Sequence, residues 1–217
     1  MASKLKIGVL GTGDVGRVLG SGYLAQGHDV KLGSRDARND KVTEWVAKAG
    51  KGASGGTFAE AAKFGDVVIL ATLWSGTENA LKLAGPDSFN GKVVIDATNP
   101  LNFGPAGVTL ALGHTDSGGE QVQRWLPKAR VVKAFNTVGN VHMVKPSFPG
   151  GPPDMFICGN DADAKKTVTD LCGELGWPTI DVGGIEGARL LEPMCILWVS
   201  YAMSHKSYDH AFKLLRK

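Results

Sequence analysis

The sequence predicts an α/β fold with a Rossmann-like, mostly parallel, doubly wound sheet and a small C-terminal helical and αβ extension. Short apolar runs alternate along the chain with segments of helical pattern, which is typical of parallel strands joined by crossover helices. Some of these runs, such as Val67–Leu70, are apolar at every position, as expected for strands that are covered on both faces. The first run also leads directly into a glycine-rich turn, Gly11–Gly16, at the position where this fold binds a dinucleotide.

The first half of the chain is predicted to contain four strands and four helices. The strands are the apolar runs Leu5–Leu10, Asp29–Leu32, Asp66–Thr72 and Lys92–Ala97. The helices are the segments Val15–Gln26, Lys41–Ala49, Phe58–Phe64 and Thr77–Ala84. Gly27 and Gly50 follow the first two helices, where a glycine commonly ends a helix. The glycine-rich stretch Gly52–Gly56 is assigned no strand and leads into the third helix.

The second half of the chain follows a long loop and is predicted to continue the α/β pattern. Its elements are the helix Glu120–Trp125, the strands Arg130–Phe135 and Met155–Cys158, the helix Ala162–Leu175, the strand Thr179–Val182 and the apolar helix Arg189–Met203. The loop Lys145–Asp154 is rich in proline and glycine, which makes it the softest boundary in the chain. We therefore expect a nucleotide-binding Rossmann domain over residues 1–150 and a small C-terminal part over residues 151–217.

Composition excludes several classes of function. The chain has 217 residues and a net charge of +3, which is too small a surplus to predict a nucleic-acid or membrane partner. Its three cysteines lie far apart, and its five histidines have no metal-ligand spacing, so neither a disulfide framework nor a metal site is expected. The apolar run before Gly11 is too short for a signal peptide. These features predict a soluble, cytoplasmic protein without a metal.

The turn after the first strand has the sequence Gly11-Thr12-Gly13-Asp14-Val15-Gly16, which is a Gly-x-Gly-x-x-Gly motif between a strand and a helix. The first glycine permits the tight turn, the second lets a pyrophosphate approach the backbone, and the third lets the helix pack close to the strand. The N-terminus of the helix offers free N–H groups to the phosphates. Because strand, turn, helix and second strand occur in the right order, the motif predicts dinucleotide binding.

The end of the second strand indicates which dinucleotide is bound. Ser34 and Arg35 stand where an NAD enzyme places an acid for the ribose 2′-hydroxyl. An arginine can bind a 2′-phosphate through two N–H groups and can stack on the adenine. Arg38 and Lys41 add positive charge nearby. We therefore expect NADP(H), although Asp36 could serve NAD if the strand is longer than predicted.

Small and polar residues follow three further strands, at the edge where a parallel sheet binds its ligands. We predict that these residues line the nicotinamide and its ribose; they are Ala71, Thr72, Leu73, Thr98, Asn99, Pro100 and Asn136. The Asn-Pro pair could equally be only a turn. No His, Lys or Tyr is evident among them as a proton donor, so we expect no catalytic acid or base. A hydride acceptor with a flavin-like ring needs none, because the ring itself accepts the hydride.

The last predicted helix, Arg189–Met203, is apolar over more than one stripe. A helix with so wide an apolar surface is buried on several sides. Since large exposed apolar patches are rare on monomers, we expect a homodimer that uses this helix, with burial inside the core as the alternative.

With these residues in view, the chain resembles the NADP oxidoreductases that use coenzyme F420, a deazaflavin. The segments that carry the resemblance are Gly11–Gly16, Gly33–Arg35, Leu73–Trp74, Ala134–Val138, Cys158–Asp161, Gly187–Pro193 and Ala211–Leu215. The resemblance implies a variant Rossmann domain whose small C-terminal part completes a cavity for the hydride acceptor. It also implies hydride transfer between NADP(H) and F420, commonly in homodimers. The family residues that contact NADP match Thr12, Gly13, Asp14, Val15, Ser34 and Arg35 here.

Other acceptors and other functions remain as alternatives. The chain has Asn136 where archaeal members of the family have histidine, and its Asp96–Pro100 segment is less apolar than theirs. FAD or FMN is therefore an alternative acceptor, since ferric reductases with the same type of domain reduce a flavin. A dehydrogenase of a small carbonyl or imine substrate is disfavoured, because such enzymes have a long helical domain after the Rossmann part. An NADPH-binding sensor without turnover is the remaining alternative.

Overall fold

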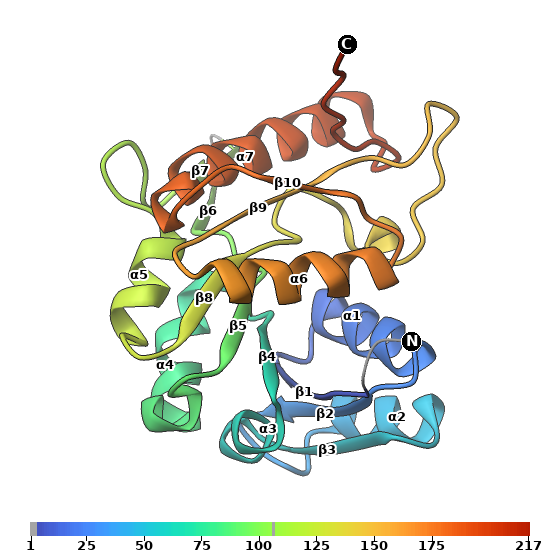
Figure 1. Ribbon diagram of the computed structural model, residues 1–217, viewed down its shortest axis with the longest axis vertical. Coiled ribbons are helices and arrows are strands. Elements are labelled where there is room, and N and C mark those ends of the chain that lie inside the picture. Colours follow the sequence, from blue (N-terminus) through green and yellow to red (C-terminus); the bar gives the residue numbers. More distant parts are fainter. Residues whose placement is uncertain (1–3, 106) are drawn as a thin grey trace.

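The computed structural model describes residues 4–105 and 107–217 of the chain. It contains one eight-stranded sheet with helices on both sides (Figure 1). The sheet strands, in chain order, are β1 (Lys6–Leu10), β2 (Asp29–Ser34), β3 (Ala53–Thr57), β4 (Val67–Leu70), β5 (Val93–Asp96), β8 (Arg130–Lys133), β9 (Met155–Gly159) and β10 (Thr179–Asp181). Across the sheet their order is β10-β9-β8-β5-β4-β1-β2-β3, and only the β8–β9 pair is antiparallel. The predicted fold class is confirmed.

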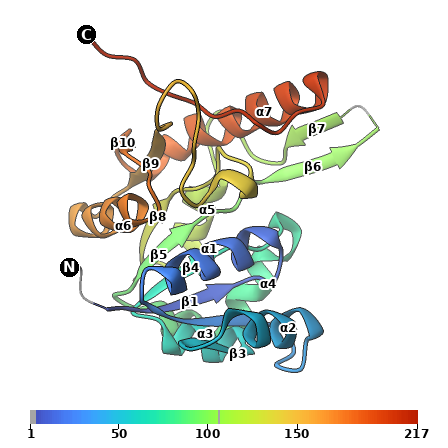
Figure 2. The same ribbon diagram turned by 90° about the vertical axis from the view of Figure 1, so that its right-hand side faces the viewer.

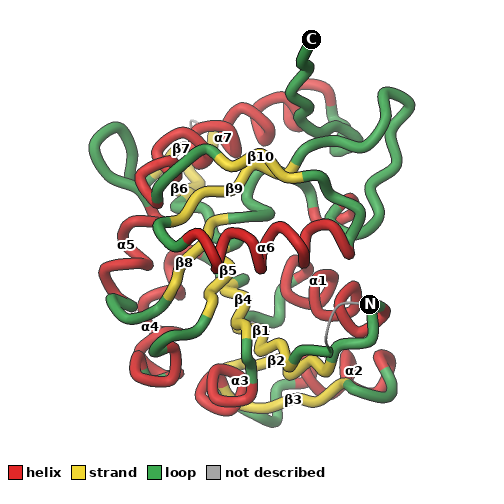
Figure 3. Tube along the Cα trace, viewed as in Figure 1, coloured by secondary structure: helices red, strands yellow, loops and turns green. Residues whose placement is uncertain are grey.

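Seven α-helices cover the two faces of this sheet in the described residues. They are α1 (Asp14–Ala25), α2 (Asp40–Ala49), α3 (Phe58–Phe64), α4 (Trp74–Ala84), α5 (Gly118–Trp125), α6 (Ala162–Glu174) and α7 (Ala188–His205). Short 3₁₀ helices lie at η1 (Pro86–Phe89), η2 (Asn140–His142) and η3 (Ile185–Gly187). Figure 3 shows the strands running through the middle of the molecule between the two layers of helices.

The layers follow from the alternation of side chains along each strand. In β4, Val67 and Ile69 face a core shared with α1, α2 and α6, while Val68 and Leu70 face a core shared with α3, α4, α5 and α7. Both sets of side chains are buried, which explains why the strand is apolar at every position.

The prediction for residues 52–56 was wrong, because this glycine-rich stretch forms the edge strand β3. It pairs in parallel with β2, for instance Lys31 with Ser54 and Gly33 with Gly56. A side chain on Gly55 would collide with Val42 of α2, so the strand has to be poor in side chains there. Strand propensity depends largely on side-chain packing, and for this reason the sequence carried no signal for β3.

The long loop of the second half also contains an element that the sequence did not predict. Strands β6 (Leu101–Gly104) and β7 (Gly107–Leu110) pair antiparallel as a hairpin, in which Leu101 pairs with Leu110. Figure 2 shows that the hairpin projects away from the eight-stranded sheet and lies below α7. Its side chains are largely exposed, so it lacks the alternating buried pattern by which a strand is recognised.

The sheet continues past residue 150, where we expected a boundary between two parts. Strand β9 pairs with β8, and β10 pairs with β9, so both parts of the chain contribute to one sheet. The functional division into residues 1–150 and 151–217 stays a prediction. Within residues 4–105 and 107–217, none of the helices has the length and apolar character that crossing a membrane requires.

Candidate active site

The candidate site lies where the order of the strands reverses. From β1 the chain passes outward to β2 and β3, and it then returns to β4 on the other side of β1. In open α/β sheets the crevice at such a point, beyond the carboxyl ends of the strands, binds the ligand. A cavity of about 940 Å³ opens there. Ten of the predicted site residues line this cavity; they are Gly11, Thr12, Gly13, Asp14, Val15, Ser34, Arg35, Ala71, Thr72 and Leu73.

The glycine-rich turn forms one wall of the cavity. Gly11 has a φ of +127°, and a side chain at this position would collide with the carbonyl group of Ala71, the residue after β4. Its N–H group donates to the carbonyl oxygen of Gly33 at 3.2 Å, which ties the turn to β2. At Gly13, by contrast, an added Cβ would meet no atom of the described residues within 4 Å.

The N-terminus of α1 opens into this space. Gly13 is its N-cap residue, and within the described chain no side chain caps the first N–H groups of the helix. Free N–H groups and the positive end of the helix dipole favour an anion. The turn therefore fits the pyrophosphate of a dinucleotide.

The end of β2 forms a second, positively charged wall. Ser34 is buried and donates its hydroxyl hydrogen to the carbonyl oxygen of Asp36, whereas Arg35 is exposed. The carboxylate of Asp36 accepts a hydrogen bond from the N–H of Arg38 at 2.9 Å and lies 3.8 Å from Nε of the same residue. Asn39 and Lys41, from the start of α2, also line the cavity. The positive charges of this wall fit the negatively charged 2′-phosphate of a dinucleotide.

The end of β4 and the start of α4 form the third wall. Helix α4 begins at Trp74, earlier than the predicted Thr77, and no side chain of the described residues caps its start, so the sequence has no capping signal there. The hydroxyl of Thr77 donates to the Leu73 carbonyl oxygen at 3.0 Å and lies 2.9 Å from the Thr72 hydroxyl. Ser75, Gly76 and Asn79 thereby join the lining, although the sequence did not identify them. They were missed because the sequence pattern predicted the start of this helix at Thr77.

The other four predicted residues do not line the cavity. Thr98, Pro100 and Asn136 are buried, and Asn99 is half-buried. In this part of the chain the cavity is lined instead by Ala97, directly after β5, and by Asn140 of η2. Thr98, Asn99, Pro100 and Asn136 therefore lie behind the wall of the cavity.

Asn99 and Asn136 bond to each other behind this wall. Nδ2 of Asn99 donates to the backbone carbonyl oxygen of Asn136 at 2.9 Å. Nδ2 of Asn136 donates to Oδ1 of Asn99 at 3.1 Å and to the carbonyl oxygen of Leu191 on α7 at 2.9 Å. The pair connects the ends of β5 and β8 to the C-terminal helix.

The residue before Asn136 has an unusual backbone. Phe135 is buried and has a φ of +62°, a left-handed conformation that is a genuine outlier for a bulky side chain. Its N–H group donates to Sδ of Met155 on β9 at 3.0 Å. Strained residues of this kind are held in place by their surroundings and cluster at functional sites.

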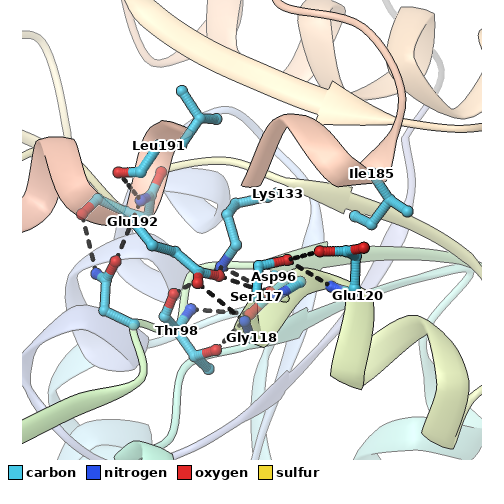
Figure 4. Close-up of polar contacts among 12 residues, drawn as sticks. Asp96, Thr98, Ser117, Gly118, Glu120, Lys133, Ile185, Leu191 and Glu192 are labelled. Carbon is cyan, nitrogen blue, oxygen red and sulfur yellow. Dashed lines mark hydrogen bonds and ion pairs between the residues drawn. The ribbon is translucent and has the colours of Figure 1, made fainter. Parts of the chain in front are cut away.

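A buried ionic cluster joins the ends of β5 and β8 to α7 (Figure 4). Lys133 at the end of β8 and Asp96 at the end of β5 are 0% exposed, and Glu192 of α7 is 1% exposed. Nζ of Lys133 lies 2.8 Å from Asp96 Oδ2 and 3.1 Å from Glu192 Oε1, and it donates to the Thr98 carbonyl oxygen at 2.8 Å. The two carboxylate oxygens of Glu192 accept hydrogen bonds of 2.9 Å from the N–H groups of Gly118 and Gly119.

The charges of the cluster support one another. Burial alone would lower the pKa of Lys133, but the carboxylates of Asp96 and Glu192 outweigh it and hold this pKa above its ordinary value. Burial raises the pKa of Glu192, and Lys133 and the two N–H groups oppose this rise. The sequence did not identify the cluster, because single charged residues at positions 96, 133 and 192 carry no spacing signal.

Trp74 and Leu214, which belong to segments that carry the family resemblance, contact other parts of the protein. Trp74 stacks on Trp125 of α5, with ring centroids 5.5 Å apart, and does not line the cavity. The N–H of Leu214 bonds to Asp154 at 2.7 Å, so the C-terminal segment packs on the loop before β9. Within residues 4–105 and 107–217, no group of three or more His, Cys, Asp or Glu side chains is arranged to hold a metal ion.

The topology and the cavity define a dinucleotide-binding protein of the Rossmann class. The model of the family described as NADP oxidoreductase coenzyme F420-dependent matches residues 6–100. The F420-dependent NADP reductase of Methanocaldococcus jannaschii is 32% identical over 216 residues, which cover 94% of this chain and 95% of that protein. The chain therefore belongs to the family of coenzyme F420-dependent NADP oxidoreductases, as the resemblance of its motifs predicted, and it is an oxidoreductase.

Two further relatives extend the comparison. A crystal structure of a protein from Arthrobacter sp. FB24, provisionally named an F420-dependent NADP reductase, superposes with a TM-score of 0.91. It is 36% identical and covers 98% of this chain and 100% of that one. The metalloreductase STEAP3 of Rattus norvegicus is 29% identical over 193 residues, which cover 86% of this chain but only 36% of that protein.

Proposed function

We propose that this protein transfers a hydride between NADP(H) and coenzyme F420. The main observation behind the proposal is that the glycine-rich turn and the pair Ser34 and Arg35 border the same cavity. The relatives from Methanocaldococcus jannaschii and Arthrobacter sp. FB24 are named for NADP and F420, which supports the same pair of substrates.

In this proposal the chain binds and orients the dinucleotide. The N–H groups at the start of α1 bind the pyrophosphate, and Arg35 and Lys41 bind the 2′-phosphate next to Ser34. Ala71, Thr72 and Ala97 border the end of the cavity that receives the nicotinamide. When bound, F420 supplies a ring that accepts the hydride itself, so the protein contributes proximity and orientation rather than an obligatory acid or base.

The charges at the end of β2 favour NADP over NAD. An acid that serves NAD accepts hydrogen bonds from the ribose hydroxyls. Asp36 also lines the cavity, but positive charges surround its carboxylate, which lies 3.8 Å from Nε of Arg38. Arg35 and Lys41, which line the same cavity, add two positive charges on the side where a 2′-phosphate would bind.

The flavins and ferric chelates are the competing acceptors, supported by the metalloreductase relative. Stopped-flow oxidation of bound NADPH by F420, FMN, FAD and a ferric chelate tests the proposal. We expect F420 to be reduced fastest, by at least tenfold over the others. A faster reaction with a flavin would assign the flavin instead, and NADPH binding without oxidation by any acceptor would indicate a sensor.

We also propose that the protein is a homodimer and that it works in the cytoplasm. The outward side of α7 carries apolar side chains that are largely exposed in one chain; they are Leu190, Leu197 and Tyr201. An apolar face of this kind is commonly covered by a partner.

The cysteines support the proposed location in the cytoplasm. All three are free and buried, which is consistent with a reducing compartment.

A further inference from the structure

The buried cluster of Asp96, Lys133 and Glu192 is not explained by stability alone. Two carboxylates and one ammonium group are removed from water there. Buried ion pairs of this kind are often no more stabilising than apolar side chains of the same size. A fold that needed only stability could have filled the space with leucine or methionine, so the cluster calls for another role.

The cluster fixes the backbone of Thr98. A lysine ammonium has three N–H donors, and those of Lys133 face Asp96, Glu192 and the Thr98 carbonyl oxygen. Oδ1 of Asp96 in turn accepts hydrogen bonds from the N–H of Thr98 at 2.9 Å and from its hydroxyl at 2.7 Å. Three polar groups of Thr98 are therefore held by two residues of the cluster.

This segment is part of the wall of the cavity. Ala97, which lines the cavity, lies between Asp96 and Thr98 in the chain. Asn99 follows and is bonded to Asn136, the residue after the strained Phe135. The segment from Ala97 to Asn99 is thus fixed at both ends by contacts that do not themselves reach the cavity.

The same contacts fix α7 relative to the sheet. Glu192 bonds to Lys133 and to the start of α5, and its neighbour Leu191 accepts the hydrogen bond from Asn136. Figure 4 shows Lys133 reaching between Asp96 and Glu192, with Thr98 and Gly118 beside them. The ends of β5 and β8, the start of α5 and the helix α7 are held by one hydrogen-bonded network.

We propose that Asp96, Lys133 and Glu192 are positioning residues for hydride transfer. They hold the wall segment Ala97–Asn99 in a fixed relation to α7, so that the nicotinamide meets the second substrate at the reacting distance. They touch neither substrate and act through Ala97, Thr98 and Asn99. This inference rests on the proposed function and extends it.

The test separates positioning from folding and from binding. The triple variant Asp96→Asn, Lys133→Met, Glu192→Gln removes all three charges at nearly constant size, and it leaves no buried charge unpaired. The single variant Glu192→Gln loosens only the link to α7. Lys165→Met is the matched control, because Lys165 pairs with Asp181 at 2.8 Å and joins α6 to β10 away from the cavity.

For each variant we would measure the melting temperature, the Kd for NADPH and the single-turnover rate of F420 reduction at saturating NADPH. We expect the Kd to stay within twofold of the wild-type value, because the contacts proposed for the phosphates are unchanged. The rate should fall at least tenfold in the triple variant and severalfold in Glu192→Gln, since small errors of position slow a transfer strongly. Lys165→Met should leave both quantities unchanged.

A folded triple variant that transfers the hydride at the wild-type rate would overturn the inference. If the triple variant does not fold, Glu192→Gln decides, and a wild-type rate in that variant overturns the inference as well. A wild-type protein that binds NADPH but does not reduce F420 would instead refute the proposed function, and the inference with it. Positioning is thereby tested separately from the choice of substrates.

Discussion

Arg35 is the residue on which the choice between NADPH and NADH depends most directly. It is exposed at the end of β2 and lines the cavity beside Lys41. A hydrogen bond from a charged group to a phosphate contributes about 1.5–3 kcal/mol, or roughly one to two orders of magnitude in affinity. We expect Arg35→Ala to weaken NADPH by that factor and NADH by much less, as measured by fluorescence titration of each dinucleotide.

Arg130→Ala is the control for this measurement. Arg130 is the first residue of β8, so it lies at the end of the strands opposite to the cavity. It donates to the Gly91 carbonyl oxygen at 3.1 Å. Its removal should leave both affinities unchanged. Equal weakening of NADPH and NADH by Arg35→Ala would mean that the guanidinium only stacks on the adenine.

Gly13 tests whether the turn binds a pyrophosphate or is merely a turn. Since an added Cβ meets no described atom within 4 Å, Gly13→Ala should fold with an almost unchanged melting temperature. The methyl group would nevertheless occupy the space next to the N–H groups of α1, and we expect the Kd for NADPH to rise about tenfold, which corresponds to ~1.4 kcal/mol.

Gly173→Ala is the matched control for Gly13→Ala. Gly173 also has free space around its Cβ position, but it lies within α6. Alanine in a helix is favoured over glycine by about 1 kcal/mol, so this variant should be as stable as the wild type or more so, with unchanged affinity. An unchanged Kd in Gly13→Ala would contradict the assignment of the turn.

At the scale of elements, α5 and α7 are joined by an ion pair that makes their contact dependent on pH. Nε of Arg189 donates to Glu120 at 2.8 Å, and Ser117 donates to the same carboxylate at 2.7 Å. The hydrogen bond from Arg189 is the main reason why the pKa of Glu120 lies below its ordinary value. A carboxyl group with a lowered pKa stabilises the fold fully above its unfolded pKa of about 4.3, and this contribution is lost as the pH falls through the folded pKa.

We therefore expect Glu120→Gln to lower the melting temperature at pH 7, with the difference from the wild type shrinking as the pH falls below about 4. Asp170→Asn is the control, because the pair Lys166–Asp170 is exposed and such pairs contribute little. Thermal unfolding followed by circular dichroism at several pH values checks this expectation. A difference that does not depend on pH would show that Glu120 acts only through packing.

The elements that could be predicted from sequence are those with apolar side chains. β1, β4 and β5 are apolar runs, and each lies within its predicted limits. β3 was missed because its glycines pair only through the backbone, and the hairpin β6–β7 was missed because none of the described residues in its strands is fully buried. The start of α4 was placed three residues late, because no capping side chain in the described part of the chain marks its true start.

The same distinction holds for the candidate site. The glycine-rich turn and the Ser34–Arg35 pair were predicted because local motifs carry their chemistry. Asp96, Lys133 and Glu192 come from three separate elements, and only the fold brings them together. Thr98, Asn99 and Asn136 were chosen correctly as strand-end residues, but their side chains bond to each other and to the cluster behind the wall of the cavity.

At the scale of the whole molecule, the proposed dimer is tested by its exposed apolar face. Leu197 is 59% exposed on the outward side of α7, whereas Trp198, its neighbour, is buried. Leu197→Glu should leave the fold intact and shift a dimer to a monomer, because a charge buried in an interface is strongly unfavourable. Lys166→Glu, on exposed α6, is the control. Light scattering that gives a monomer for the wild type at micromolar concentration would contradict the proposal.

The central claim is that a hydride passes directly from the nicotinamide to the deazaflavin ring. A single turnover with F420 and NADPH that carries deuterium at both hydrogens of C4 tests this claim most directly, with the reduced F420 analysed by mass spectrometry. We expect one deuterium in each reduced F420 and none released to water, with a rate that changes little across neutral pH. Reduced F420 without deuterium, or deuterium found in the solvent, would mean that the hydrogen does not move as a hydride between the two rings.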